Sequence, residues 1–420
     1  MGYNPQVSLK MFEINPVIFT LSNRIKVVYL RREAFVAHLG VLIYAGSRFE
    51  KENEQGLAHF IEHCIFKGTK KRKAFDVFTD LDSVGGELNA YTNKEEIAVH
   101  ASFRKLHFNI AAELLGDIVQ NATFPEEEMI KEKEVILDEI MSYLDSPGER
   151  IHDEFEGHLF KGHSLGYNIL GTEDSVNGFT REDVEAYMER LFTPDNMVIS
   201  FVGDVPIDEV RDSLESNFGE ICRVGSDSEK LAVVNSPKFQ IREKKSNFQT
   251  HTMIGGFAPS FNDDSRRAMT LVTNLLGGPA LNSRLILSIR EKYGYAYNVE
   301  ANYMPYSDTG FWNIYVGTDK KYLDKTISLI HDELKRICDT SLTSIELESA
   351  KEQLKGHLAL SLDSNIELMF NLGKSVLLFG KVDSMQVIYD HIDSVTIEQA
   401  QKIAQSSFDT SLISELIFEY

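Results

Sequence analysis

Residues 59–63 are His-Phe-Ile-Glu-His, and these five residues could bind a metal ion and activate a water molecule. His59 and His63 are four residues apart, so on a helix both imidazoles project from one face and can bind one ion. Glu62 lies on the same face and is placed to take a proton from a water at the metal. The pattern is H-x-x-E-H, the inverse of the H-E-x-x-H zinc helix. The alternative is a pair of helix-surface histidines beside an acid.

A catalytic zinc site needs a third protein ligand and one open position for water. The acidic segment 125–145 is the expected source, because a proline followed by three glutamates predicts the start of a helix there. Glu128, Glu132 and Glu139 lie roughly on one face of that helix. Helical periodicity does not choose between them, and a solvated helix face is the alternative for each.

With these residues the sequence resembles the pitrilysin/insulysin family of zinc metallopeptidases, the inverzincins, over nearly the whole chain. Its length is similar to the shorter branch, which includes the mitochondrial processing peptidases and their bacterial relatives. The family's third ligand lies in a pattern E-x-x-x-I-x-x-E, which here is Glu132-Lys-Glu-Val-Ile-Leu-Asp-Glu139. The resemblance implies Glu139 as the ligand that joins His59 and His63, Glu132 as a supporting carboxylate, and one zinc ion per chain.

The segment 85–92, Gly-Gly-Glu-Leu-Asn-Ala-Tyr-Thr, is similar to the family's substrate-binding edge strand. An exposed strand edge can pair with an extended peptide through backbone groups. The resemblance implies that Asn89, Ala90 and Tyr91 bind substrate in this way. An ordinary hairpin strand is the alternative.

Arg290 and Tyr297 match an arginine and a tyrosine that the family carries seven residues apart, in Arg-Glu-Lys-Tyr-Gly-Tyr-Ala-Tyr. The resemblance implies that Arg290 binds a substrate carbonyl. It implies that Tyr297 donates a hydrogen bond to the oxyanion, where a preorganised donor lowers the barrier. Without the family, the two residues would be a surface charge and a strand aromatic.

Strands and helices alternate along the first part of the chain and are expected to position these residues. Runs rich in Val, Ile and Tyr predict strands over 25–30, 36–46, 87–92, 96–102 and 198–203. Amphipathic patterns predict helices over 54–67, 105–121, 125–145, 181–191 and 207–217. Thr180 with Asp183 predicts a capping box at the start of the fourth helix.

The second part of the chain repeats the first at an offset of 218 residues. Segment 124–147 then lies over 342–365, with matching apolar positions, and both segments reach Leu-Asp-Ser in register. An internal duplication explains the match, and two amphipathic helices that agree by chance are the alternative. At this offset His59 falls on Gly277, His63 on Leu281 and Glu139 on His357. The metal chemistry is therefore expected in one copy.

We predict an α+β protein of two similar halves, each a mainly antiparallel sheet with helices packed on one face. Residues 1–222 form the zinc-binding half, 223–245 a linker, and 246–420 the half with Arg290 and Tyr297. The resemblance implies a clamshell of four such domains. A chain of 420 residues supplies two of them, so a homodimer is implied, with Arg290 and Tyr297 acting on the partner's zinc site.

Composition limits the partners and the compartment. The chain carries 43 Lys and Arg against 64 Asp and Glu, a net charge of −21, which disfavours nucleic acid and favours basic peptides. Hydrophobic residues at 43% and charged residues at 25% exclude a disordered chain and a polytopic membrane protein. Three cysteines without C-x-x-C spacing, and no leader or membrane-spanning run, predict a cytoplasmic protein away from membranes.

The sequence thus predicts a zinc metalloendopeptidase that hydrolyses unfolded peptides enclosed in a dimeric chamber. The His/His/Glu ligand set favours zinc over other divalent ions. The alternative is a non-catalytic peptide-binding or scaffold subunit with the same fold.

Overall fold

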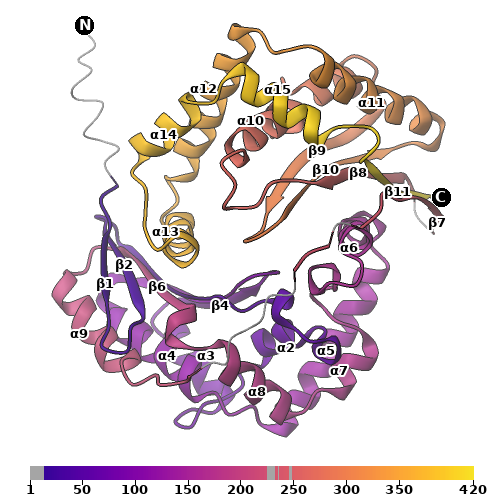
Figure 1. Ribbon diagram of the computed structural model, residues 1–420. Helices are drawn as coiled ribbons and strands as arrows, with labels where there is room; N and C mark the ends of the chain where they lie inside the picture. Colours follow the sequence, from indigo (N-terminus) through magenta and orange to yellow (C-terminus); the bar gives the residue numbers. More distant parts are fainter. Residues whose placement is uncertain (1–13, 225–231, 235, 246–247) are drawn as a thin grey trace, which may run out of the picture. The chain divides into compact units, whose positions relative to one another are not determined.

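The computed structural model describes residues 14–224, 232–234, 236–245 and 248–420 (Figure 1). Their packing divides the chain into two compact units that interleave along the sequence. Unit 1 comprises Met1–Ile140, Tyr167–Lys230 and Leu360–Val387, and unit 2 comprises Met141–Gly166, Leu231–Ala359 and Ile388–Tyr420, counting described residues in each. No helix among these residues is both long enough and apolar enough to cross a bilayer.

Unit 1 is built on a six-stranded sheet in the order β1-β2-β6-β3-β5-β4. β2 and β6 pair in parallel and the other neighbours are antiparallel. The strands are β1 (Val17–Thr20), β2 (Lys26–Arg31), β3 (Val36–Ile43), β4 (Glu87–Thr92), β5 (Ile97–Arg104) and β6 (Met197–Gly203). The five strands expected from the sequence are confirmed, with ends that match or are shifted by up to three residues.

Helices of the first half of the chain pack on one face of this sheet and enclose its larger core. They are α2 (Leu57–Cys64), α3 (Ala74–Asp82), α4 (Phe108–Asn121), α5 (Glu126–Leu144), α7 (Glu173–Gly178), α8 (Arg181–Leu191) and α9 (Ile207–Phe218). The opposite face is covered by α13 (Asn365–Phe379), which comes from the second half of the chain. Leu368, Met369 and Leu372 of α13 are buried there against the sheet.

Unit 2 repeats this plan with a five-stranded sheet in the order β7-β11-β8-β10-β9. β7 and β11 pair in parallel, as β2 and β6 do. The strands are β7 (Gln240–Lys244), β8 (Thr250–Phe257), β9 (Ala296–Pro305), β10 (Gly310–Thr318) and β11 (Ser414–Glu419). The helices are α6 (Pro147–Leu159), α10 (Arg266–Gly277), the π-helix η7 (Ile286–Glu291), α11 (Leu323–Asp339), α12 (Ser344–Ser361), α14 (Met385–Asp393) and α15 (Ile397–Ser407).

The prediction of two similar halves is confirmed, because β7-β11-β8-β10-β9 corresponds strand by strand to β2-β6-β3-β5-β4. The units nevertheless differ from the predicted ranges 1–222 and 246–420, because each sheet packs a helix from the other half of the sequence. α6 lies on the unit 2 sheet against β8 and β11, and α13 lies on the unit 1 sheet. The predicted linker over 223–245 contains β7, and part of it lies outside the described residues.

Candidate metal centre

The helix that carries the H-x-x-E-H motif is short, and a distant side chain holds its first turn. α2 starts after Gly56, which has a φ of 90° and provides no side-chain cap. Glu50 replaces the cap: its Oε2 accepts from the Gly56 N–H at 3.0 Å and its Oε1 from the Ala58 N–H at 2.9 Å. Glu50 is buried, and burial raises its pKa to about 8 against the opposing effect of these donors and of Lys94. The carboxyl group satisfies two donors that a helix start leaves unpaired.

His59 and His63 project from α2 toward Glu139 of α5. The Glu139 Oε2 atom lies 3.8 Å from His59 Nε2 and 3.6 Å from His63 Nε2. The three ligand atoms lie within 4.8 Å of one another, and within the described part of the chain they form the group of His, Cys, Asp and Glu side chains suited to hold a metal. Tetrahedral zinc with ligands at about 2.1 Å spaces them about 3.4 Å apart, so a small closure of this group fits the ion.

The protonation state of His59 also suits metal binding. Burial and the neighbouring His63 lower the pKa of His59 to about 4, so its imidazole is neutral near pH 7 and offers a lone pair. The His59 Nδ1 atom is buried without a hydrogen-bond partner, which leaves Nε2 as the atom engaged at the site. The neighbouring Cys64 is less suited, because burial raises the pKa of its thiol and keeps it protonated.

Glu62 is half-buried beside the three ligand atoms. Burial raises the pKa of its carboxyl, while a hydrogen bond from Thr92 and the proximity of His63 act in the opposite direction. A carboxylate with a raised pKa takes up a proton more readily than a solvated one. Glu62 is therefore placed and tuned to exchange a proton next to the metal position.

The structure distinguishes the three glutamates of α5 that periodicity left open. Glu139 faces the histidines, and Glu132 accepts a hydrogen bond from His63 Nδ1 at 3.1 Å. Glu128 pairs instead with Lys131 at 2.6 Å on the surface. Because Glu132 binds Nδ1 of His63, the Nε2 atom is left to face Glu139, as a metal-binding histidine requires.

The edge strand β4 ends beside this site. β4 is the last strand of its sheet and pairs with β5, so its other edge has no strand partner among the described residues. Its final residue, Thr92, reaches back to the Ala58 carbonyl of α2 at 3.5 Å. The Tyr91 side chain is engaged with Glu96 and with the Phe370 ring at 5.3 Å, so its backbone is the part free to bind a peptide.

Arg290 and Tyr297 lie together in unit 2. The Arg290 guanidinium carbon is 5.5 Å from the centre of the Tyr297 ring, and the Tyr297 side chain is 89% exposed at the start of β9. The exposed hydroxyl is free to donate a hydrogen bond. Arg290 and Tyr297, which the sequence analysis named together, therefore lie in contact within unit 2.

The sequence analysis missed Glu50 and Lys67, and it placed Thr92 only in the expected edge strand, without a contact to α2 or Glu62. Lys67 lies 2.7 Å from Glu132, and its spacing of four residues from His63 was a signal that could have been used. Glu50 and Thr92 reach α2 from other parts of the fold, so no local spacing marks them.

Two family models cover most of the chain. The model of the insulinase family, peptidase family M16, matches residues 26–173, which include the motif on α2 and the glutamates of α5. The model described as the peptidase M16 inactive domain matches residues 178–354, with Arg290 and Tyr297. The chain belongs to peptidase family M16, in its short bacterial branch. The metal ligands and the inactive-domain match thus fall in different parts of this M16 chain.

Relatives and solved structures agree with this family. The chain is 34% identical to the "Uncharacterized zinc protease YmxG" of Bacillus subtilis over 90% of its own length and 92% of that protein. It is 32% identical to a Mycobacterium leprae protein with a similar name, over 88% and 83% of the two chains. A protease from Helicobacter pylori shares the fold with a TM-score of 0.87 at 20% identity, covering 97% of this chain and all of that one. The relatives' names support a protease.

Proposed function

We propose that this M16 chain is a zinc-dependent endopeptidase that hydrolyses unfolded peptides. The observation that carries the proposal is the approach of His59, His63 and Glu139 to one point, with Glu62 beside them. Zinc, when bound there, would polarise the scissile carbonyl and lower the pKa of its water toward about 7. Family membership and the names of the relatives support the same reaction.

Other residues of the chain transfer the proton and bind the substrate. Glu62 takes the proton of the attacking water and returns it to the leaving amine. The open edge of β4, with Asn89, Ala90 and Tyr91, pairs with the extended substrate backbone, so recognition depends weakly on substrate sequence. The net charge of −21 favours basic peptides.

The experiment compares wild type with Glu62→Gln on a library of quenched short peptides, and zinc is measured in both proteins. We expect kcat/KM to fall about 100- to 10,000-fold while zinc stays near one per chain. Glu127→Gln is the matched control, because Glu127 is an exposed acid in the first turn of α5. Unchanged turnover would remove Glu62 from the mechanism. A wild type with neither zinc nor turnover would favour the scaffold alternative.

The proposal includes a homodimer in which Arg290 and Tyr297 serve the partner's zinc site in an enclosed chamber. Mixing Glu62→Gln with Tyr297→Phe tests it, because each mixed dimer would then contain one intact composite site. We expect equal amounts of the two inactive variants to recover about a quarter of wild-type activity after subunit exchange. Size-exclusion chromatography checks that mixed dimers form. If they form without recovering activity, Tyr297 acts in the zinc site of its own chain.

A further inference from the structure

Lys67 reaches the metal centre through Glu132. Its Nζ atom lies 2.7 Å from Glu132 Oε1, and Glu132 Oε2 lies 3.1 Å from His63 Nδ1. One carboxylate oxygen is thus held by an ammonium group and the other by a ligand imidazole. The side chains of Lys67 and Glu132 are 22% and 10% exposed, so water weakens their attraction less than at an open surface.

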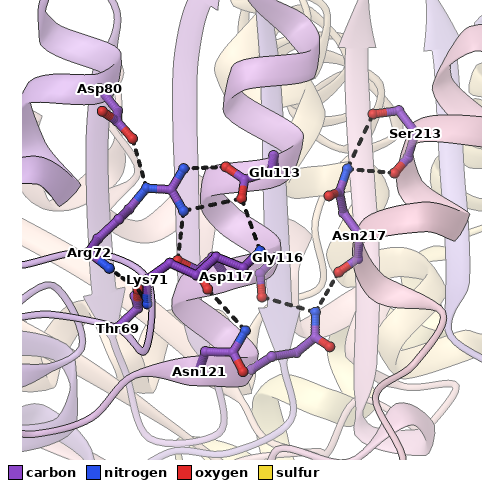
Figure 2. A network of polar contacts seen from close by, with 11 residues as sticks. Thr69, Lys71, Arg72, Asp80, Glu113, Gly116, Asp117, Asn121, Ser213 and Asn217 are labelled. Carbon is purple, nitrogen blue, oxygen red and sulfur yellow. Dashed lines mark hydrogen bonds and ion pairs between the residues drawn. The ribbon is translucent and has the colours of Figure 1, made fainter.

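The backbone that carries Lys67 is fixed on both sides. On one side, the Lys67 N–H donates to the carbonyl of Cys64, the last residue of α2, at 3.0 Å. On the other, Figure 2 shows Arg72 surrounded by acidic side chains of α3 and α4, with its Nη1 2.7 Å from Asp117. Thr69 donates to the same buried carboxylate at 2.6 Å. The Lys67 side chain therefore approaches Glu132 from an anchored loop.

The position of Glu132 gives this contact a role at the metal centre. Glu139 faces the Nε2 atoms of His59 and His63, whereas Glu132 lies at the opposite edge of the His63 ring, on Nδ1. A Glu132 carboxylate that could turn freely would leave Nδ1 without its acceptor, and the imidazole could then rotate its Nε2 away from Glu139. The site would lose one of its three protein ligands. An ammonium group on Oε1 restrains such a turn and leaves Oε2 to the imidazole.

We propose that Lys67 is a positioning residue that keeps Glu132 hydrogen-bonded to Nδ1 of His63, so that Nε2 of His63 stays directed at the metal position. The site then has three protein ligands and one open position. This inference rests on the proposed zinc peptidase function. It predicts that loss of Lys67 weakens zinc binding and alters the geometry at the metal, whereas a purely structural role would lower the stability of the zinc-free protein.

The test uses Lys67→Met, Lys67→Arg and Glu132→Gln in the full chain. Zinc affinity is measured by chelator competition, the geometry by the visible absorption of the cobalt-substituted protein, and kcat and KM separately. We expect Lys67→Met to weaken zinc affinity about 10- to 100-fold, with KM of the zinc-loaded enzyme little changed and denaturant unfolding of the zinc-free protein as in wild type. The cobalt spectrum should change with the orientation of His63, and Lys67→Arg should restore both zinc affinity and spectrum.

Two further comparisons make the result specific. Lys131→Met removes the same charge one residue before Glu132, from an exposed lysine that pairs with Glu128, and should leave zinc affinity and spectrum unchanged. In a Glu132→Gln background, Lys67→Met should have no further effect, because the two act in one chain of contacts. Multiplicative effects on zinc affinity, or an unaltered zinc affinity and cobalt spectrum in Lys67→Met, would overturn the role of Lys67 while wild-type activity upheld the peptidase. A wild type that binds no zinc would overturn both.

Discussion

The two units share a scaffold down to single positions in the middle of each sheet. In unit 1 Gly40 of β3 lies directly across from Ser200 of β6, and in unit 2 Gly255 of β8 lies across from Ser414 of β11. Both glycines lie under the helix that comes from the other half of the sequence. A Cβ atom on Gly40 would come within 2.5 Å of the Met369 sulfur of α13. A Cβ atom on Gly255 would come within 2.2 Å of the Trp312 carbonyl oxygen of β10 and within 3.1 Å of the Phe155 ring of α6. The glycine is thus crowded by the helix in unit 1 and chiefly by the adjacent strand in unit 2.

The units differ at the helix that follows β3 in unit 1 and β8 in unit 2. β8 starts 214 residues after β3, whereas the later helices follow the offset of 218. At 214 the positions of His59 and His63 are taken by Thr273 and Gly277, neither of which binds zinc. Both units therefore keep the sheet and the helix that comes from the other half of the sequence, α13 in unit 1 and α6 in unit 2. Only unit 1 carries the metal ligands.

The largest expected effect comes from removing a ligand in unit 1. We expect His59→Ala to abolish stoichiometric zinc binding, because two ligand atoms then remain and neither supporting contact replaces the lost nitrogen. The loss should exceed the ~100-fold that removal of a supporting partner causes. Peptidase activity should disappear with the metal. Elemental analysis after dialysis, together with the peptide assay, measures both.

The matched variant in unit 2 is His357→Ala, at the position that corresponds to Glu139. Since His357 has no metal partner group among the described residues, zinc and turnover should stay at wild-type levels. Zinc retained by His59→Ala, or lost by His357→Ala, would contradict the assignment of the metal to unit 1.

A second prediction concerns the exchanged helices. Leu368 of α13 and Ile151 of α6 are both buried, each against the sheet of the unit named above. Replacing either by alanine removes buried methyl groups and leaves a cavity, at a cost of about 2–5 kcal/mol. Hydrogen exchange can locate the loss: Leu368→Ala should weaken protection of β3 and β6, and Ile151→Ala that of β8 and β11.

The control for these variants is Leu360→Ala, because Leu360 is 72% exposed near the end of α12. Its hydrogen-exchange pattern should match that of wild type. If Leu368→Ala instead weakened protection of the strands from the second half of the sequence, the packing of α13 on the unit 1 sheet would be wrong.

Local patterns in the sequence were enough to predict most strands and helices of unit 1 and the two histidines of its metal site. The H-x-x-E-H spacing put His59 and His63 on one face of α2, and Thr180 with Asp183 forms the expected capping box at α8. These features succeed because side chains three or four residues apart meet on a helix whatever the rest of the chain does. The sequence match between α5 and α12 could be found for the same reason, because both helices keep apolar residues at the same helical positions.

Contacts between distant segments were not predictable in this way. Nothing in the pattern of 365–379 indicates that Met369 packs against β3 of the first half, because its apolar face would suit either sheet. The choice of Glu139 over Glu128 as the residue facing the histidines needed the family pattern. In the structure Glu139 Oε2 lies within 3.8 Å of both imidazoles, whereas Glu128 pairs with Lys131. Glu50 was missed because its partners at Gly56 and Ala58 are backbone groups, which leave no mark in sequence.

The remaining prediction tests how the metal helix is held, again as a contrast between the units. α10 starts after Ser265, which makes no side-chain cap hydrogen bond, whereas α2 depends on Glu50. The pKa of Glu50 is raised by burial from 4.5 to about 8, so the folded protein favours the protonated form. Its contribution to stability is complete below about pH 4.5 and is lost as pH rises toward 8, by up to about 1.4 kcal/mol per pH unit.

Glu50→Gln cannot ionise, so the difference in unfolding free energy between wild type and variant should fall across this range. Denaturant unfolding of the zinc-free protein measures it without a contribution from metal binding. Glu54→Gln is the control of opposite sign: burial raises the pKa of Glu54, but the hydrogen bonds from Arg190 and the Lys51 backbone, together with the charges of both residues, lower it overall. Its contribution is present above about pH 4.5 and lost in acid, so between pH 5 and 8 its difference should stay flat. A flat difference for Glu50→Gln as well would show that the carboxylate at the start of α2 is already ionised, and that the N–H groups of Gly56 and Ala58 outweigh its burial.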